Sequence, residues 1–254
     1  MAGQGNNSMT KKIIHLFKND LRLSDNPAFT EACNSGHVIP IYILDESDLY
    51  DESAQNWWLQ NSLEELKKSL DNNLYFYRGN YKNIISSIVS ENNVQAVYWN
   101  RSYDPHSIER DKNLKFFLEE KGIEVKTFNS MLLWEPWQVA KPDGSPYRVF
   151  SPFYRKGCLN QEEPRFPLPE PSKINYSKIN GSTDVESINL LSGFNWYDKL
   201  GQHWEIGEKA AQKKLSLFLD DGIEDYKDGR NFPSKKNVSR LSPHIRFGEI
   251  SPNQ

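Results

Sequence analysis

Cysteine, methionine and histidine are scarce in this chain of 254 residues, which contains two, three and five of them respectively. Cys33 and Cys158 lie far apart, and no cluster of cysteines and histidines surrounds either one. Disulfide frameworks need several cysteines, and zinc sites need clustered ligands. We therefore expect two buried thiols, no disulfide and no metal site.

Long apolar runs are also missing. No stretch approaches the roughly 18 apolar residues that span a bilayer. The first eight residues lack the charged and apolar regions of a signal peptide. We expect residues 1–11 to form a disordered tail on a cytoplasmic protein that has no membrane partner and is a monomer.

A strong positive charge is absent as well, because the formal net charge is −3. This balance argues against a protein that coats nucleic acid with its whole surface. Residues 226–254 are an exception, since they carry six basic side chains against two acidic ones. A solvated basic face and a phosphate-binding surface both fit this local excess.

Five short apolar and β-branched runs predict buried strands. They are Lys12–Phe17, Val38–Leu44, Leu74–Tyr77, Val94–Trp99 and Ile123–Phe128. Helical patterns lie between them, and alternation of strands and helices with short connections favours a parallel sheet covered by helices on both faces. The fold class is therefore predicted as α/β, with a doubly wound, parallel, five-stranded sheet.

Apolar stripes predict two of the helices between the strands. Capping chemistry predicts where two helices begin. The stripes are Leu59, Leu63, Leu66 and Leu70 in one helix and Ile108, Leu114, Phe117 and Leu118 in another. At Asn26-Pro27 and Asp104-Pro105, a side-chain oxygen precedes a proline. The oxygen can cap free amides while the proline occupies the first helical position.

The pattern changes after the predicted sheet. Residues 161–189 are rich in Pro, Ser, Asn and Lys and have little periodicity, which predicts a linker that runs over the surface. Helical periodicity returns at Gly207–Asp221, and Gly222 is expected to end that helix in a left-handed cap. We divide the chain into a tail (1–11), an α/β domain (12–135), a linker (136–203) and the start of a helical domain (204–254).

A glycine cradle for phosphate is missing, since neither a Gly-x-Gly-x-x-Gly run nor a Walker loop follows the first strand. Ligands of open parallel sheets settle beyond the carboxyl ends of the strands. The predicted strand ends offer a polar rim of mixed charge that includes Lys18, Asn19, Asp20, Asp45, Arg78, Gly79, Asn100 and Arg101. Arg22, Asp25 and Asn26 are interpreted as structural, forming a cap and a salt bridge within a turn.

Two motifs near the ends of the chain resemble the DNA photolyase and cryptochrome family. Ile13–Ala28 is similar to the first strand and turn of the photolyase antenna domain. Asp225–Pro233 and Asn237–Pro252 resemble the segment where FAD enters the helical domain of class I photolyases. The resemblance covers nearly all of residues 11–254 and implies a Rossmann-like antenna domain followed by the beginning of an all-helical FAD-binding domain. We interpret the chain as an N-terminal portion that ends before most of that domain.

The resemblance implies specific site residues. Those expected to contact FAD, mainly its diphosphate, are Tyr226, Val238, Ser239, Arg240, Leu241 and Ser242. Val238 stands where Thr or Ser is common, which would lose one hydrogen bond worth about 0.5–1.5 kcal/mol. Arg230 matches an arginine that reaches toward the DNA backbone. Free amides at a helix that begins near Pro243 would favour the phosphates, although the same run also fits an ordinary helix cap.

The function implied by the resemblance is light-dependent repair of cyclobutane pyrimidine dimers, in which reduced FAD donates an electron to a dimer flipped out of DNA. The catalytic residues of the family lie beyond residue 254, so no catalytic residue is predicted here. An antenna chromophore, either a deazaflavin or a folate, is also implied. His106 and Ser107 stand where relatives that use folate tend to carry Asn-Glu, which weakens the case for folate.

Two other functions share these motifs. One is a blue-light sensor of the cryptochrome type, and the other is a non-catalytic α/β remnant that holds a chromophore or nothing. The seven tryptophans are interpreted as core or interdomain packing. We expect a chain of this extent to be inactive alone.

Overall fold

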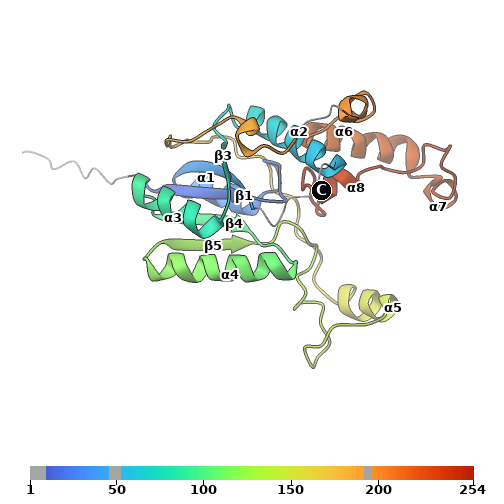
Figure 1. The fold of residues 1–254 in the computed structure, drawn as a ribbon. Helices are drawn as coiled ribbons and strands as arrows, with labels where there is room; N and C mark the ends of the chain where they lie inside the picture. Colours follow the sequence, from blue (N-terminus) through green and yellow to red (C-terminus); the bar gives the residue numbers. More distant parts are fainter. Residues whose placement is uncertain (1–9, 46–52, 192–195) are drawn as a thin grey trace, which may run out of the picture.

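The computed structural model describes residues 10–45, 53–191 and 196–254 and contains a five-stranded parallel sheet (Figure 1). The strands are β1 (Lys12–Phe17), β2 (His37–Leu44), β3 (Tyr75–Arg78), β4 (Ala96–Asn100) and β5 (Glu124–Phe128). Their order in the sheet is β3-β2-β1-β4-β5. The predicted fold class and all five strands are confirmed, with boundaries that differ by at most two residues.

Helices cover both faces of the sheet. They are α1 (Pro27–Ser35), α2 (Ala54–Ser69), α3 (Tyr81–Asn92) and α4 (Pro105–Glu120). Apolar residues of α1 and α2 share one core with the side chains of Ile13 and Phe17, and those of α3 and α4 share a second core with Ile14 and Leu16. Alternate residues of β1 thus feed opposite cores, as the period of a strand requires.

Both predicted helix starts are confirmed. Asn26 Oδ1 accepts a hydrogen bond from the Phe29 amide at 3.1 Å, and Asp104 Oδ1 accepts one from the Ser107 amide at 2.9 Å. The apolar stripe of α2 is buried or half-buried as expected. The stripe of α4 is wrong at Ile108, which is 47% exposed, so only its second half packs on the sheet.

The stretch at residues 161–189, which was expected to run over the surface, returns to the core. It follows α5 (Phe150–Pro152) and a wide helical turn at Phe153–Cys158, which protrude beyond the sheet (Figure 1). Val185 and Ile188, near its end, and Leu190, just after it, are buried against α2 and β3. Three apolar residues among polar neighbours gave too little periodicity to predict this packing. The division into domains stays a prediction.

The last part of the described chain is helical and lies beyond the carboxyl edge of the sheet (Figure 1). It contains α6 (Glu208–Leu217), a wide turn at Phe218–Gly222, α7 (Tyr226–Gly229) and α8 (Ser242–Arg246). The left-handed cap predicted at Gly222 is wrong, because its φ is not positive. A Cβ there would lie 2.7 Å from the Phe218 ring, so a close contact explains this glycine.

The scarcity of cysteine and the lack of long apolar runs each gave an expectation about the structure. Cys158 is buried as expected, but the expectation of a buried thiol is wrong for Cys33, which is half-buried; both are free thiols. Burial raises the pKa of Cys33 to about 12. Across the ranges 10–45, 53–191 and 196–254, no helix is long and apolar enough to cross a membrane.

Candidate functional site

The winding of the sheet reverses between β1 and β4, and the loops after these strands meet there. Asp20 organises this point. It accepts hydrogen bonds from the Lys18 amide at 2.6 Å and from Asn100 Nδ2 at 2.5 Å. The hydrogen bond between Asn100 and Asp20 holds the two loops together. Both residues are almost fully buried, so they do not form part of the open rim that the sequence predicted.

A cavity of about 550 Å³ opens beside this junction. It lies where a ligand of a doubly wound sheet is expected. Its lining includes Lys18, Asn19, Tyr81, Tyr103, His106, Ser107, Arg110 and Arg246. Of the residues predicted to form the rim, only Lys18 and Asn19 line this cavity. Asp45 does not line it, but its Oδ2 lies 4.0 Å from Nη1 of Arg110, which does.

Positive charge in this cavity is partly balanced. Lys18 Nζ is bonded to Asp111 Oδ2, and burial lowers the pKa of Lys18 although Asp111 opposes this effect. The Arg110 guanidinium lies 4.1 Å from the centre of the Tyr81 ring. Two aromatic rings beside several cations are suited to a planar ligand that carries negative charge.

The C-terminal segment is fixed to the sheet by a buried polar cluster. Trp58 Nε1 on α2 donates to Glu249 Oε1 at 3.1 Å, and the other Glu249 oxygen lies 2.5 Å from His244 Nδ1 on α8. The next turn needs a glycine, since Gly248 has a φ of 68° and a Cβ there would lie 2.0 Å from the Asn19 carbonyl. These contacts seat α8 directly on the loop after β1.

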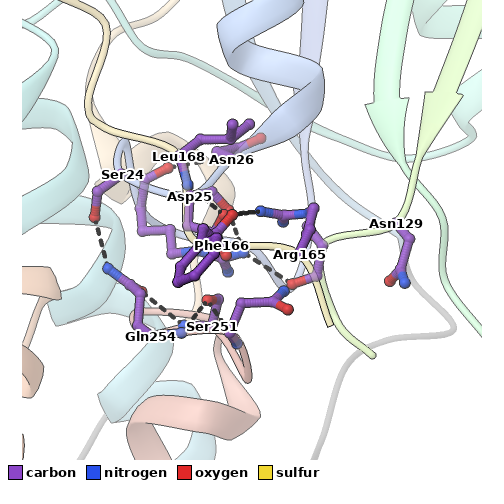
Figure 2. Close-up of polar contacts among 12 residues, drawn as sticks. Ser24, Asp25, Asn26, Asn129, Arg165, Phe166, Leu168, Ser251 and Gln254 are labelled. Carbon is purple, nitrogen blue, oxygen red and sulfur yellow. Dashed lines mark hydrogen bonds and ion pairs between the residues drawn. The ribbon is translucent and has the colours of Figure 1, made fainter. Parts of the chain in front are cut away.

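A second set of contacts seals the turn before α1. Arg165 Nη1 is bonded to Asp25 Oδ1, and the Leu168 amide donates to the same oxygen at 2.9 Å. Figure 2 shows Arg165 pointing toward Asp25 while Gln254 reaches Ser24. The predicted salt bridge within the turn is therefore wrong, because the partner of Asp25 comes from the stretch after α5. Arg22 instead donates to backbone carbonyls.

The residues predicted to contact FAD occupy two segments that touch. Gly229, at the end of α7, lies against Asn237, whose Nδ2 also donates to the Gly222 carbonyl at 3.4 Å. Tyr226 and Val238 are 41% and 38% exposed. Of the remaining residues, Ser239 is half-buried, Arg240 and Ser242 are exposed, and Leu241 is buried.

The helix after this run differs from the expectation. Ser242, and not Pro243, is its first residue, and α8 has only five residues. A helix this short has a weak dipole, so its free amides contribute less to phosphate binding than predicted. Arg230, the predicted DNA contact, is exposed beside Tyr226, with its guanidinium 5.6 Å from the ring centre.

Lys214 is a neighbour of this site that the sequence analysis missed. Burial lowers the pKa of Lys214, and the nearby charge of Arg240 lowers it further. An anion near these two side chains would offset the repulsion between them. Lys214 lies on α6, 26 positions before Arg240, so no local pattern connects the two.

A profile of the DNA photolyase family matches residues 13–172, which is more than half of the chain. The chain belongs to the DNA photolyase family. It is 38% identical over 249 residues to a deoxyribodipyrimidine photo-lyase of Agrobacterium fabrum, covering 96% of this chain and 52% of that protein. It is 33% identical to cryptochrome-2 of Arabidopsis thaliana, covering 96% of this chain and 42% of that protein.

The fold matches a solved photolyase as well. A class III photolyase from Agrobacterium tumefaciens has a TM-score of 0.92 and 36% identity, with 99% of this chain and 53% of that chain covered. The chain thus spans about half the length of these three relatives. Membership in the photolyase family is confirmed. The class I subdivision stays a prediction, since this structural relative is described as class III.

Proposed function

We propose that this chain forms the N-terminal part of a deoxyribodipyrimidine photo-lyase, a cytoplasmic monomer that acts on ultraviolet-damaged DNA. The observation that carries the proposal is the contact between Gly229, at the end of α7, and Asn237, which brings the segment of Tyr226 against the run that begins at Val238. A diphosphate beside Arg240 would also offset the effect of its charge on Lys214. FAD supplies a diphosphate, and in its reduced, excited state it can donate an electron to a pyrimidine dimer.

The chain's own residues would hold one side of the cofactor. Tyr226 and the run Val238–Ser242 form the two halves of a clasp that meet at Gly229 and Asn237. Arg240 has a φ of 52°, a conformation that is costly for a residue with a side chain and is often found at ligand sites. Arg230 would contact a DNA phosphate, which contributes affinity and salt dependence but little sequence preference.

The cavity of about 550 Å³ is the site we propose for an antenna chromophore. Its cations suit the acidic groups of a deazaflavin or a folate. His106 and Ser107 both line it, so the departure from Asn-Glu falls on the surface that such a ligand would touch. This favours deazaflavin over folate.

Two alternatives share the same evidence. The identity to cryptochrome-2 supports a blue-light sensor as readily as a repair enzyme. A non-catalytic remnant would keep the α/β domain and bind a chromophore or nothing. The three functions differ in whether flavin is retained and whether dimers are split.

The test uses the protein encoded by the complete reading frame that contains this chain. Blue light should make it split thymine dimers in an irradiated oligonucleotide, and the reaction should not proceed in darkness. Bound flavin without dimer splitting would favour the sensor, and no flavin would favour the remnant. The chain of 254 residues alone should retain little FAD, because most contacts to a buried cofactor would be missing.

Arg230→Glu should weaken binding to irradiated DNA and lower the salt dependence. Lys112→Glu is the matched control, since Lys112 is an exposed cation on α4, far from α7 (Figure 1). Equal effects of the two substitutions would contradict a contact at Arg230.

A further inference from the structure

Residues 139–160 form an arm that protrudes beyond the sheet and contains α5 and the wide turn at Phe153–Cys158 (Figure 1). The start and the end of this α5 arm lie against each other at Gly157. A Cβ at that position would lie 2.9 Å from the Val139 carbonyl oxygen and 3.3 Å from the Tyr147 ring. The α5 arm is therefore a folded element whose side chains have defined positions.

The outer side of the α5 arm carries two exposed aromatic rings. Phe150 is 73% exposed and Tyr154 is 45% exposed, whereas Gly157 and Cys158 are buried. The two rings are stacked, with their centres 5.8 Å apart and an angle of 8° between their planes. Large apolar side chains that gather in the open commonly mark a binding surface. Parallel rings of this kind suit a partner that is itself flat.

The same arm carries an excess of positive charge. Its basic side chains are Lys141, Arg148, Arg155 and Lys156, and its only acidic one is Asp143, although the formal net charge of the chain is −3. Arg148, Arg155 and Lys156 are exposed, and none of them forms an ion pair with a described residue. On the α/β domain, by contrast, Lys126 Nζ lies 2.6 Å from Glu31 Oε1. The positive charge on the arm is therefore available to a negatively charged partner.

Exposed rings among unpaired cations match the chemistry of a nucleic-acid strand, which presents a phosphate and a flat base in each nucleotide. Proteins that bind single strands combine a basic surface with aromatic side chains on which the bases stack. In a duplex the bases are stacked on one another, so a duplex would use only the cations of the arm. A protein partner that covered the rings would also have to neutralise the cations beside them, since an uncompensated buried charge is strongly destabilising.

We propose that the α5 arm binds a single strand of nucleic acid. An unpaired base stacks on the open face of the Phe150 and Tyr154 pair, and the phosphates lie beside the three exposed cations. This binding goes beyond the proposed function, because it requires neither flavin nor a damaged base. It is also separate from the contact proposed at Arg230, since α5 and α7 lie apart in Figure 1.

Binding is measured in darkness from the fluorescence anisotropy of labelled, undamaged oligothymidylate added to the chain of 254 residues. An abasic oligomer of the same length has the phosphates without the bases, and a duplex of that length has paired bases. Loss of base stacking should weaken binding of the abasic oligomer at least about fivefold. The proposal is overturned if oligothymidylate does not bind saturably, or if the abasic oligomer binds as tightly. Neither result would bear on dimer splitting, because no dimer and no light are used.

Phe150→Ala tests the stacking. It should weaken binding of oligothymidylate about tenfold through the lost stacking, and it should leave binding of the duplex and of the abasic oligomer unchanged. Phe116→Ala is the matched control, because Phe116 is a phenylalanine on α4 that is 63% exposed. Both rings are exposed, so neither replacement threatens folding. Equal affinities of the two variants for oligothymidylate would overturn the proposal.

Arg155→Gln tests the phosphate contacts. Removal of one cation should weaken binding of every probe, and it should reduce the slope of log affinity against log salt concentration by about 0.7 for oligothymidylate. Lys112→Gln, at an exposed cation on α4, should leave that slope unchanged. In the protein from the complete reading frame, Phe150→Ala should again weaken binding of oligothymidylate. Unchanged affinity there would show that the rest of that longer protein covers the arm, and would overturn the proposal.

Discussion

Arg22 Nη1 donates a hydrogen bond to the Gly248 carbonyl at 2.9 Å, although 226 positions separate the two residues. Arg22 Nη2 donates to the Asp25 carbonyl at 2.7 Å and to the Ser130 carbonyl at 2.9 Å. The side chain is 1% exposed. Arg22 therefore ties the turn before α1 to the segment after β5 and to the turn after α8.

Arg22→Ala should strongly destabilise the protein. Three buried carbonyls would lose a charged donor, and each buried group left unsatisfied costs about 1–3 kcal/mol. We expect a loss of about 3–5 kcal/mol in the free energy of unfolding, measured by urea denaturation. Arg22→Lys should restore only part of it, because one ammonium group cannot reach all three carbonyls. Arg148→Ala, at an exposed arginine, is the control, and an equally small effect of both alanine variants would contradict this role.

The contacts of Arg22 and Asp25 show which parts of this fold could be predicted from sequence. Asn26 capping α1 was predictable because donor and acceptor lie three positions apart. The five strands were predictable because each buried run carries its own pattern. Arg165 as the partner of Asp25 was not predictable, since 140 positions separate them and no periodicity links the two.

The same distinction between local patterns and contacts of distant residues applies to the candidate sites. The meeting of the β1 and β4 loops followed from the winding rule for parallel sheets. The sequence did not show that Lys18 lines the cavity whereas Asp20 is buried, because the burial of Asp20 depends on its hydrogen bond from Asn100. The effect of the Arg240 charge on Lys214 likewise depends on the tertiary fold.

His15 should make the stability of the fold depend on pH. It lies in the core between Phe17 and Phe29, and neither of its ring nitrogens has a hydrogen-bond partner among the described residues. Burial lowers the pKa of His15 to about 4. The unfolded chain therefore binds a proton at higher pH than the folded chain, so this contribution is complete above about pH 6.5 and is lost as the pH falls toward 4.

His15→Leu should flatten this dependence. We expect the unchanged chain to lose about 2 kcal/mol of stability from this group between about pH 7.5 and 5, and the variant to lose that much less. Urea unfolding at the two pH values measures the difference. His203→Leu, at an exposed histidine, should leave the slope unchanged. An identical slope in His15→Leu and the parent would contradict a neutral, buried imidazole.

Asp25 should govern stability in a more acidic range. Burial alone would raise the pKa of Asp25, but hydrogen bonds from Arg165, Ser251 and the Leu168 amide outweigh burial and lower it. The contribution is therefore present above the ordinary pKa of about 3.9 and is lost as the pH falls through the lower, folded value. Asp25→Asn should lose less stability between about pH 5 and 3 than the parent chain. Asp220→Asn, at an exposed carboxylate, serves as the control.

Gly229→Ala tests whether the two halves of the proposed FAD clasp must touch. A Cβ at this position would lie 2.4 Å from Asn237 Cβ, so α7 and the run before α8 would have to separate. We expect the protein from the complete reading frame to be purified with several-fold less bound FAD, measured by flavin absorbance per chain. Gly201→Ala is the matched control, because a Cβ there meets only Trp57, at 3.8 Å. Asn237→Gly removes the atom that clashes, so the double variant should recover flavin if the contact itself is what matters. Full flavin content in Gly229→Ala would show that Tyr226 and Ser239 need not be held together to retain the cofactor.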